Sequence, residues 1–387
     1  MGAGGTFEHM ARIALNGRLL VPGKLEGIGR FTLRTLERLV ALRPDDQFLL
    51  VVDRPEDEMF HLGPNVEVRR IRIPARRPWL IRWWFGRPLG GLLRRWKADA
   101  FVSLEGPLAT EMPPEFPQMT VIHDLNFEHR PEGLPKVWAR YYRTEFPGYA
   151  RRAQCLGTVS EFSKSDLVAT YGLESRDIEV FSNAADPEFV PARESEKTAA
   201  QQDFAGGRPY WVFVGSLHPR KNLDGLFKAF QKYVEEGGAW DLVVVGAAMW
   251  GKEDGRGDSS VDHRVHFVGR LNSAQLVHAV AGAEALVFIP WFEGFGIPVV
   301  EAMACGVPVI ASNVTSLPEV CGDAAFAMVD PGDVTQIASA MSNLERNPEA
   351  ARSASERGVA RAKDFSWDRT AELVSRAVDR LLETRSA

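Results

Sequence analysis

Two glutamates and two glycines share one short stretch, and their spacing suggests a binding site. Glu293 and Glu301 lie eight positions apart, with Gly294 and Gly296 between them. The pattern predicts an apolar strand over 285–289, a loop over 290–297, a helix whose first turn holds Glu301, and a second strand over 307–311. The glycines let the backbone approach a ligand, and a helix start offers free N–H groups and a positive dipole. Such a loop suits a ligand that carries both hydroxyls and phosphates, as a nucleotide-sugar does.

A simpler explanation exists for the same two carboxylates. Glu293 would cap the helix, and Glu301 would merely favour the positive helix end. The glycines, the proline at position 298 and the spacing together favour the ligand-binding interpretation.

Two adjacent cations form the second candidate site. An apolar strand over 210–214 leads into Gly215 and Ser216, and Arg220 and Lys221 precede a helix over 223–234. Helix starts normally favour acids, so cations at this position need another reason. A diphosphate supplies one, because Arg can bind it through its planar fork and Lys as a point charge.

The stretch EGFGIPVVE followed by AMACGVPV resembles the E-x7-E signature of glycosyltransferase family 4. Members of that family are retaining enzymes of the GT-B fold that take sugars from nucleotide donors. The resemblance covers nearly the whole chain and is most specific in its second half. It implies an α/β, GT-B architecture with two Rossmann-like domains facing across a cleft, an acceptor-side domain at 10–190 and a donor-binding domain at 208–364. A terminal helix within 365–387 would return to the first domain.

The resemblance also implies roles for individual residues. His123, in the element Val-Ile-His-Asp-Leu, and Glu293 would contact the donor sugar, and Glu301 would recognise the ribose. Arg220 and Lys221 would stabilise the leaving diphosphate, and Asp124 would either orient the His123 ring or cap a turn. The other donor-binding positions lie in glycine-containing turns: Gly27, Gly29, Gly215, Ser216, Gly269, Arg270, Leu271, Gly294, Phe295, Gly296 and Ile297.

Two residues depart from the family pattern. Ser216 stands where many members carry Arg directly after the glycine, so Arg220 would take over that role. Ala184 stands where glycine is usual in the hinge-like run NAADPEFVP. Residues 191–207 read as a linker, and residues 247–263 as a long loop able to cover the cleft.

Composition limits the partners. A net charge of −5 and the absence of nucleic-acid motifs argue against nucleic-acid binding. Three scattered cysteines form no metal pattern. No cofactor or metal is therefore expected, and the nucleotide-sugar is a substrate. With no apolar run long enough to span a bilayer, we expect a cytoplasmic protein.

The segment 69–97 is unusual because it holds ten Arg or Lys residues, no acid, and four tryptophans. Three explanations compete: core tryptophans with a solvated basic face, peripheral contact with the anionic inner face of a membrane, and a nucleic-acid surface. The net acidity of the chain makes the third the weakest.

The sequence thus predicts a retaining glycosyltransferase that acts on a glycan or lipid-linked acceptor. GDP-mannose is the favoured donor. The runs GIGR at 27–30 and PRKN at 219–222 resemble those of bacterial mannosyltransferases of cell-surface polysaccharide synthesis, including lipopolysaccharide. The alternatives are a nucleotide-sugar epimerase on the same fold and a nucleotide-binding module without catalysis.

Overall fold

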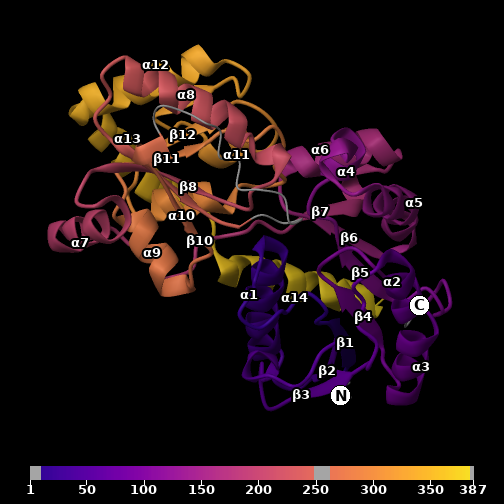
Figure 1. Ribbon diagram of the computed structural model, residues 1–387. Coiled ribbons are helices and arrows are strands. Elements are labelled where there is room, and N and C mark those ends of the chain that lie inside the picture. The colour runs from indigo at the N-terminus through magenta and orange to yellow at the C-terminus, as the bar shows by residue number, and fades with distance from the viewer. Residues whose placement is uncertain (1–9, 248–261, 384–387) are drawn as a thin grey trace, which may run out of the picture.

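The computed structural model describes residues 10–247 and 262–383 and has two α/β domains, each built on a parallel sheet (Figure 1). The expected α/β architecture of two Rossmann-like domains is therefore confirmed. Almost all of the segment 247–263, which the sequence suggests as a cover for the cleft, lies outside the described residues.

The first sheet has seven strands in the order β3-β2-β1-β4-β5-β6-β7. Its strands are β1 (Arg12–Asn16), β2 (Gln47–Val52), β3 (Val66–Arg70), β4 (Ala100–Ser103), β5 (Gln118–Val121), β6 (Cys155–Thr158) and β7 (Ile178–Val180). The helices of this part of the chain are α1 (Gly27–Leu42), α2 (Pro78–Phe85), α3 (Arg87–Trp96), α4 (Asn126–His129), α5 (Lys136–Arg152) and α6 (Glu161–Tyr171). The strand order reverses between β1 and β4, because the chain builds β2 and β3 on one side of β1 before crossing to the other.

The second sheet has six strands in the order β10-β9-β8-β11-β12-β13 and reverses between β8 and β11. Its strands are β8 (Tyr210–Val214), β9 (Asp241–Val245), β10 (Val265–Gly269), β11 (Ala285–Phe288), β12 (Val309–Ser312) and β13 (Ala327–Val329). The helices that follow the first domain are α7 (Glu194–Ala205), α8 (Leu223–Glu235), α9 (Ser273–Ala281), α10 (Ile297–Ala304), α11 (Leu317–Cys321), α12 (Val334–Arg346), α13 (Pro348–Ala362) and α14 (Trp367–Glu383). All five residues of β8 and of β9 are buried, as expected for central parallel strands covered on both faces.

Helix α14 lies beside α1 of the first domain, although it follows the second domain in the chain (Figure 1). Its apolar face, which includes Trp367, Val374 and Val378, is buried. The Trp367 indole donates to the Asp186 carboxylate at 3.1 Å, and the Thr370 hydroxyl donates to the Ser182 carbonyl at 2.6 Å.

The prediction of a linker over residues 191–207 is wrong, because most of this stretch forms α7. Ala200 and Ala205 are buried, and the helix packs against α9 of the second domain. The Lys197 ammonium also pairs with the Glu284 carboxylate at 2.7 Å. Small apolar residues and side-chain pairing fix this helix in place, and its alanines, the acids in its first turn and Gly206 at its left-handed C-cap favour a helix locally.

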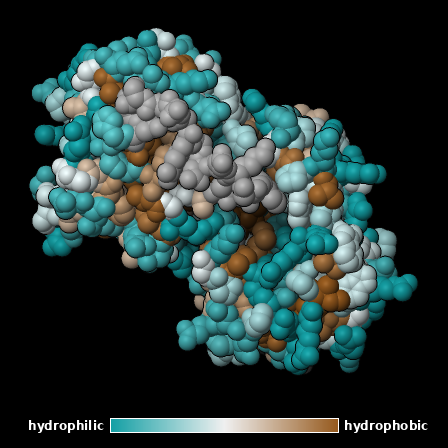
Figure 2. Space-filling view, viewed as in Figure 1, coloured by the Kyte–Doolittle hydropathy of each residue, from teal (hydrophilic) through white to brown (hydrophobic). Residues whose placement is uncertain are grey.

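The two domains form two lobes, and hydrophilic side chains cover most of the face in Figure 2. Several polar contacts join the lobes. The Glu319 carboxylate accepts hydrogen bonds of 2.9 Å from the backbone N–H groups of both Glu161 and Phe162, at the start of α6. A carboxylate of the second domain thus neutralises the positive end of a first-domain helix.

Candidate functional site

The point where the second sheet reverses carries the chemically distinctive loops. The chain leaving β8 reaches Arg220 and Lys221, and the chain leaving β11 reaches Glu293. Asn222 adopts a left-handed backbone with φ 58°, and its side-chain amide donates to the carbonyls of Ile289 (3.2 Å) and Pro331 (2.7 Å). These bonds tie the two loops together at the carboxyl ends of neighbouring strands, the usual ligand position in such sheets.

Glu293 pairs with both cations. Its Oε1 accepts hydrogen bonds from Arg220 Nη1 and from Lys221 Nζ, and Lys221 and Glu293 are both buried. Arg220 also donates to the Phe292 carbonyl at 3.1 Å. No side chain caps α10, so the simpler explanation of Glu293 as a helix cap is wrong.

Burial and mutual attraction compete at this cluster. Burial lowers the pKa of Lys221 to about 8, against the opposing attraction of Glu293. Burial alone would raise the pKa of Glu293, but the two cations outweigh it, Arg220 first, and the pKa is lowered. The carboxylate is therefore ionised near neutral pH, and it occupies cations that can also bind a phosphate.

Gly294 lets the second domain pack against the His123-Asp124 pair of the first domain (the HD element). A Cβ atom at this position would lie 2.3 Å from the His123 carbonyl oxygen and 2.9 Å from Asp124 Cβ, so only glycine fits. The Gly294 carbonyl accepts hydrogen bonds from the hydroxyls of Ser160 (2.7 Å) and Ser163 (3.2 Å). The predicted loop and the predicted HD element are thus side by side.

His123 is held as a neutral ring. Its Nε2 lies 2.8 Å from the Leu104 carbonyl, and its ring packs edge-on to Phe31 at 4.8 Å between centroids. Burial lowers its pKa, which favours the neutral ring. Because the Leu104 carbonyl can only accept a hydrogen bond, Nε2–H is the donor and Nδ1 is the accepting nitrogen. The Asp124 carboxylate accepts from the Asn126 backbone N–H at 3.0 Å, which makes it a turn cap.

Glu301 lies in the second turn of α10, not in the first as expected, because the helix begins at Ile297. It is buried and pairs with Arg30 of α1, across the two domains. Burial raises the pKa of Glu301, and Arg30 opposes that rise. Gly27, in the first turn of α1, also faces the second domain, since a Cβ there would lie 3.5 Å from Ile297 Cδ1.

Two groups of the remaining predicted positions follow strands of the second sheet, β8 and β10. Gly215 is near Lys221, as a Cβ atom on it would lie 3.5 Å from Lys221 Cε, and Ser216 follows it. Gly269 (φ 69°), Arg270 and Leu271 follow β10, and Arg270 pairs with Glu26 before α1 at 2.5 Å.

Two positions serve packing in this structure. Phe295 is buried and packs edge-on to Phe365 at 5.3 Å, and Gly29 leaves room for the Leu19 carbonyl. Gly296 has φ 103° and precedes the first residue of α10, which explains the glycine there.

Comparison with known proteins identifies the family. Residues 25–189 match the model "Glycosyltransferase Family 4", and residues 194–361 match "Glycosyl transferases group 1". The O-antigen chain mannosyltransferase B of Escherichia coli is 30% identical over 363 residues, which cover 89% of this chain and 93% of that protein. The chain belongs to glycosyltransferase family 4.

Further relatives agree with this assignment. The O-antigen chain mannosyltransferase RfbU of Salmonella typhimurium is 28% identical over 242 residues, covering 60% of this chain and 62% of that protein. The sucrose-phosphate synthase of Thermosynechococcus elongatus superposes with a TM-score of 0.76 at 17% identity, over 96% of this chain and 99% of that one. At that identity the likeness shows the fold, which is the GT-B fold of this glycosyltransferase.

Sequence reasoning missed four residues that shape the site of this glycosyltransferase. Arg30 pairs with Glu301, Ser160 and Ser163 hold the Gly294 carbonyl, and Glu319 joins the second domain to α6. Arg30 stands in the GIGR run, so a cation beside the glycines was the available signal. The serines and Glu319 carry no such signal, because their partners are backbone groups of the other domain.

Proposed function

We propose that this enzyme transfers mannose from GDP-mannose, with retention of anomeric configuration, to a glycan or lipid-linked acceptor in cell-surface polysaccharide synthesis. The main support for this proposal is the Glu293–Arg220–Lys221 cluster, which lies at the reversal point of the second sheet, beside His123. Two relatives named as O-antigen mannosyltransferases support mannose as the sugar. We further propose that the enzyme acts in the cytoplasm.

The proposed reaction proceeds on one face of the donor sugar. The acceptor hydroxyl oxygen forms a bond to the anomeric carbon on the side from which the diphosphate leaves. The carbon–oxygen bond to the phosphate breaks, and a diphosphate oxygen takes the hydroxyl proton. Arg220 and Lys221 would stabilise the charge that develops on the diphosphate, so we propose that no metal is needed. Glu293 and His123 Nδ1 would hold sugar hydroxyls.

The donor assignment is tested by a panel of nucleotide-sugars. With octyl α-mannoside as acceptor, we expect transfer from GDP-mannose to exceed transfer from GDP-glucose, UDP-glucose and UDP-galactose by at least about tenfold, and to persist in EDTA. Proton NMR of the product should show an α anomeric centre, as in the donor. A β product would contradict retention, and equal transfer from UDP-glucose would contradict the assignment of GDP-mannose as the donor. Conversion of the donor sugar without acceptor would indicate the epimerase alternative.

We also propose that the segment 69–97 contacts an anionic membrane surface. Trp84 and Phe85 of α2 are buried, which fits the core-packing explanation, but Trp79 and Trp83 are 62% and 46% exposed. Helix α2 packs on α5, where Val137 is 59% exposed. Within residues 10–247 and 262–383, no helix combines the length and apolar character needed to cross a bilayer. Exposed tryptophans among cations suit the interface of anionic lipids.

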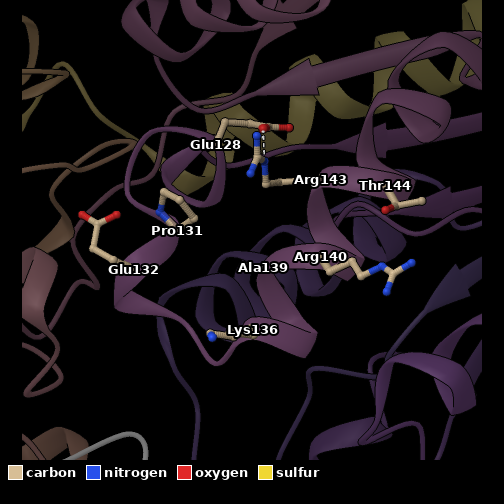
Figure 3. A pocket seen from close by; sticks show the side chains of 8 residues that line it. All are labelled: Glu128, Pro131, Glu132, Lys136, Ala139, Arg140, Arg143 and Thr144. Carbon is tan, nitrogen blue, oxygen red and sulfur yellow. Dashed lines mark hydrogen bonds and ion pairs between the residues drawn. The ribbon is translucent and has the colours of Figure 1, made fainter.

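A pocket on α4 and α5 adds positive charge near this surface (Figure 3). Three cations line it, Lys136, Arg140 and Arg143, together with two acids. Lys136 and Arg140 are exposed, and Arg143 is 55% exposed although it pairs with Glu128 at 2.9 Å. These exposed cations therefore supplement those of the segment 69–97.

Liposome flotation tests the membrane proposal. Wild-type protein should bind vesicles containing phosphatidylglycerol more than phosphatidylcholine vesicles, and salt should weaken the binding. Replacing Trp79 and Trp83 with Ala should reduce binding at least about tenfold, because each large apolar side chain buried contributes roughly 1.5–3 kcal/mol. Val190→Ala, at a 55% exposed valine outside the segment, is the control and should bind as wild type. Equal binding to both vesicle types at low salt would contradict membrane contact.

A further inference from the structure

A second polar cluster is built into the first domain, at the point where its own sheet reverses. Asn16 ends β1 and Ser103 ends β4, the two strands between which the order changes. The Asn16 amide donates to the Ser103 hydroxyl at 3.0 Å and to Glu105 Oε1 at 2.6 Å. The other carboxylate oxygen of Glu105 pairs with Arg18. The crevice at such a reversal point is where open α/β sheets bind ligands.

Stability does not explain this cluster. The side chains of Glu105 and Arg18 are only 1% and 15% exposed. Removing an ion pair from water costs free energy that the attraction often fails to offset, so apolar residues would serve a purely structural role as well or better. A buried ion pair at a ligand-binding edge therefore points to a binding role.

The loop carrying Arg18 is fixed before any ligand arrives. Arg54 donates to the Arg18 carbonyl at 2.9 Å and to the Leu20 carbonyl at 3.3 Å, and its own partner is the Asp53 carboxylate at 2.8 Å. Arg18 Nη1 donates weakly to the Ala75 carbonyl at 3.4 Å. Pre-organisation of this kind reduces the entropy cost of binding.

Arg18 retains donors that these contacts do not use. A guanidinium has more N–H groups than the Ala75 carbonyl and the Glu105 carboxylate engage. Its Nε is buried without a hydrogen-bond partner among the described residues. Nε itself has no accessible surface, but the side chain is 15% exposed, so part of it can meet a ligand oxygen.

The cluster is adjacent to the proposed transfer site. Glu105 directly follows Leu104, whose carbonyl accepts the His123 Nε2 hydrogen bond. Tyr142 of α5 is half-buried and lies close enough to interact electrostatically with Arg18, Glu105 and Asp124. The Trp138 ring stacks on Tyr142 at 5.7 Å between centroids. Charged groups can form hydrogen bonds with the hydroxyls of a sugar, and aromatic rings can pack against its apolar C–H face. This cluster offers both kinds of group.

We propose that Arg18 binds oxygen atoms of the acceptor glycan, with Glu105 as the positioning residue that holds the guanidinium and Tyr142 as a neighbouring contact. This inference rests on the proposed glycosyl transfer and adds to it the place where the acceptor sugar binds. The donor and acceptor then lie at the reversal points of two facing sheets, with His123 between them.

The test uses ligand-observed NMR of the full chain in the presence of GDP. The probes are the octyl glycosides of mannose, glucose, galactose and N-acetylglucosamine. At least one should show saturation transfer from wild-type protein, and Arg18→Gln should weaken its binding about tenfold to a hundredfold. GDP affinity by calorimetry should stay unchanged in Arg18→Gln. Glu105→Gln should also weaken glycoside binding, and Arg18→Lys should retain part of it.

The matched control is Asp46→Asn. Asp46 is a buried carboxylate of the same domain that pairs with Arg43 at 2.6 Å, but it precedes β2 and so lies at the opposite edge of the sheet. It should leave glycoside and GDP binding as in wild type. If Arg18→Gln fails to fold, the double variant Arg18→Gln, Glu105→Gln replaces it, because that variant leaves no unpaired charge.

The outcomes separate this inference from the proposed function. The acceptor site is overturned if wild type binds no glycoside, if Arg18→Gln binds glycoside fully, or if Asp46→Asn loses as much glycoside binding as Arg18→Gln. In each of these cases, GDP binding by wild type still supports the donor site. Loss of GDP affinity in Arg18→Gln overturns it as well, since Arg18 would then serve the donor. Failure of wild type to bind GDP at all contradicts the proposed function itself.

Discussion

The Glu293→Gln variant is expected to lose turnover by about a hundredfold or more while binding GDP more tightly than wild type. The loss follows because Glu293 is proposed to hold the donor sugar in the geometry of transfer, and removing one such contact commonly costs that much. The gain follows from the free enzyme, where the same carboxylate occupies both Arg220 and Lys221. Without its negative charge, the two cations are available to the diphosphate from the start.

Initial rates and calorimetry on the same preparations check both halves of this result. Glu284→Gln provides the control, since Glu284 also pairs with a lysine, Lys197 of α7 at 2.7 Å, but this pair lies outside the site. It should leave rate and GDP affinity near wild-type values. Weaker GDP binding by Glu293→Gln would show that the carboxylate does not compete with the diphosphate, and unchanged turnover would remove it from the site.

Lys221→Ala is expected to weaken GDP binding about tenfold to a hundredfold. A charge-assisted hydrogen bond to phosphate contributes roughly 1.5–3 kcal/mol, which corresponds to that range. The wild-type pH profile should report the same residue, because burial lowers the pKa of Lys221 to about 8. The ammonium is present below that pH and is lost above it. GDP affinity should therefore fall as pH rises from about 7 to about 9, and this fall should be absent in Lys221→Ala.

Lys197→Ala is the matched control for the lysine. Lys197 pairs with Glu284 and is half-buried, so its loss removes a paired ammonium without touching the site. Its GDP affinity and pH profile should follow wild type. A flat profile in wild type, or full affinity in folded Lys221→Ala, would contradict phosphate binding by Lys221.

The sequence predicts those parts of the site that lie within one strand–loop–helix unit. Glu293, Gly294 and Gly296 share one loop, and Arg220 and Lys221 share another, so local spacing sufficed to select them. Parallel sheets bring such loops to one edge, which the structure bears out for Glu293 and Lys221. The strand and helix pattern likewise predicted two α/β domains.

Contacts that depend on how the domains dock were beyond local patterns. The partner of Glu301 is Arg30, which lies 271 positions earlier in the chain. Glu319 meets backbone groups of α6, and any sequence presents those groups. The linker prediction over residues 191–207 is wrong for a different reason, because this stretch does carry local helix signals: acids in the first turn, Glu194 and Glu196, and Gly206 at the left-handed C-cap.

The position of α14 has a consequence for biosynthesis. The first domain leaves the ribosome before the second, yet α14 follows the second domain in the chain and covers α1. The buried face of α14, with Trp367, Val374 and Val378, is therefore missing from the nascent first domain until the second has been translated. Domains usually fold in order of synthesis. Here the domain that starts first is completed last, so an interrupted translation product would expose the apolar surface of α1 to chaperones and proteases.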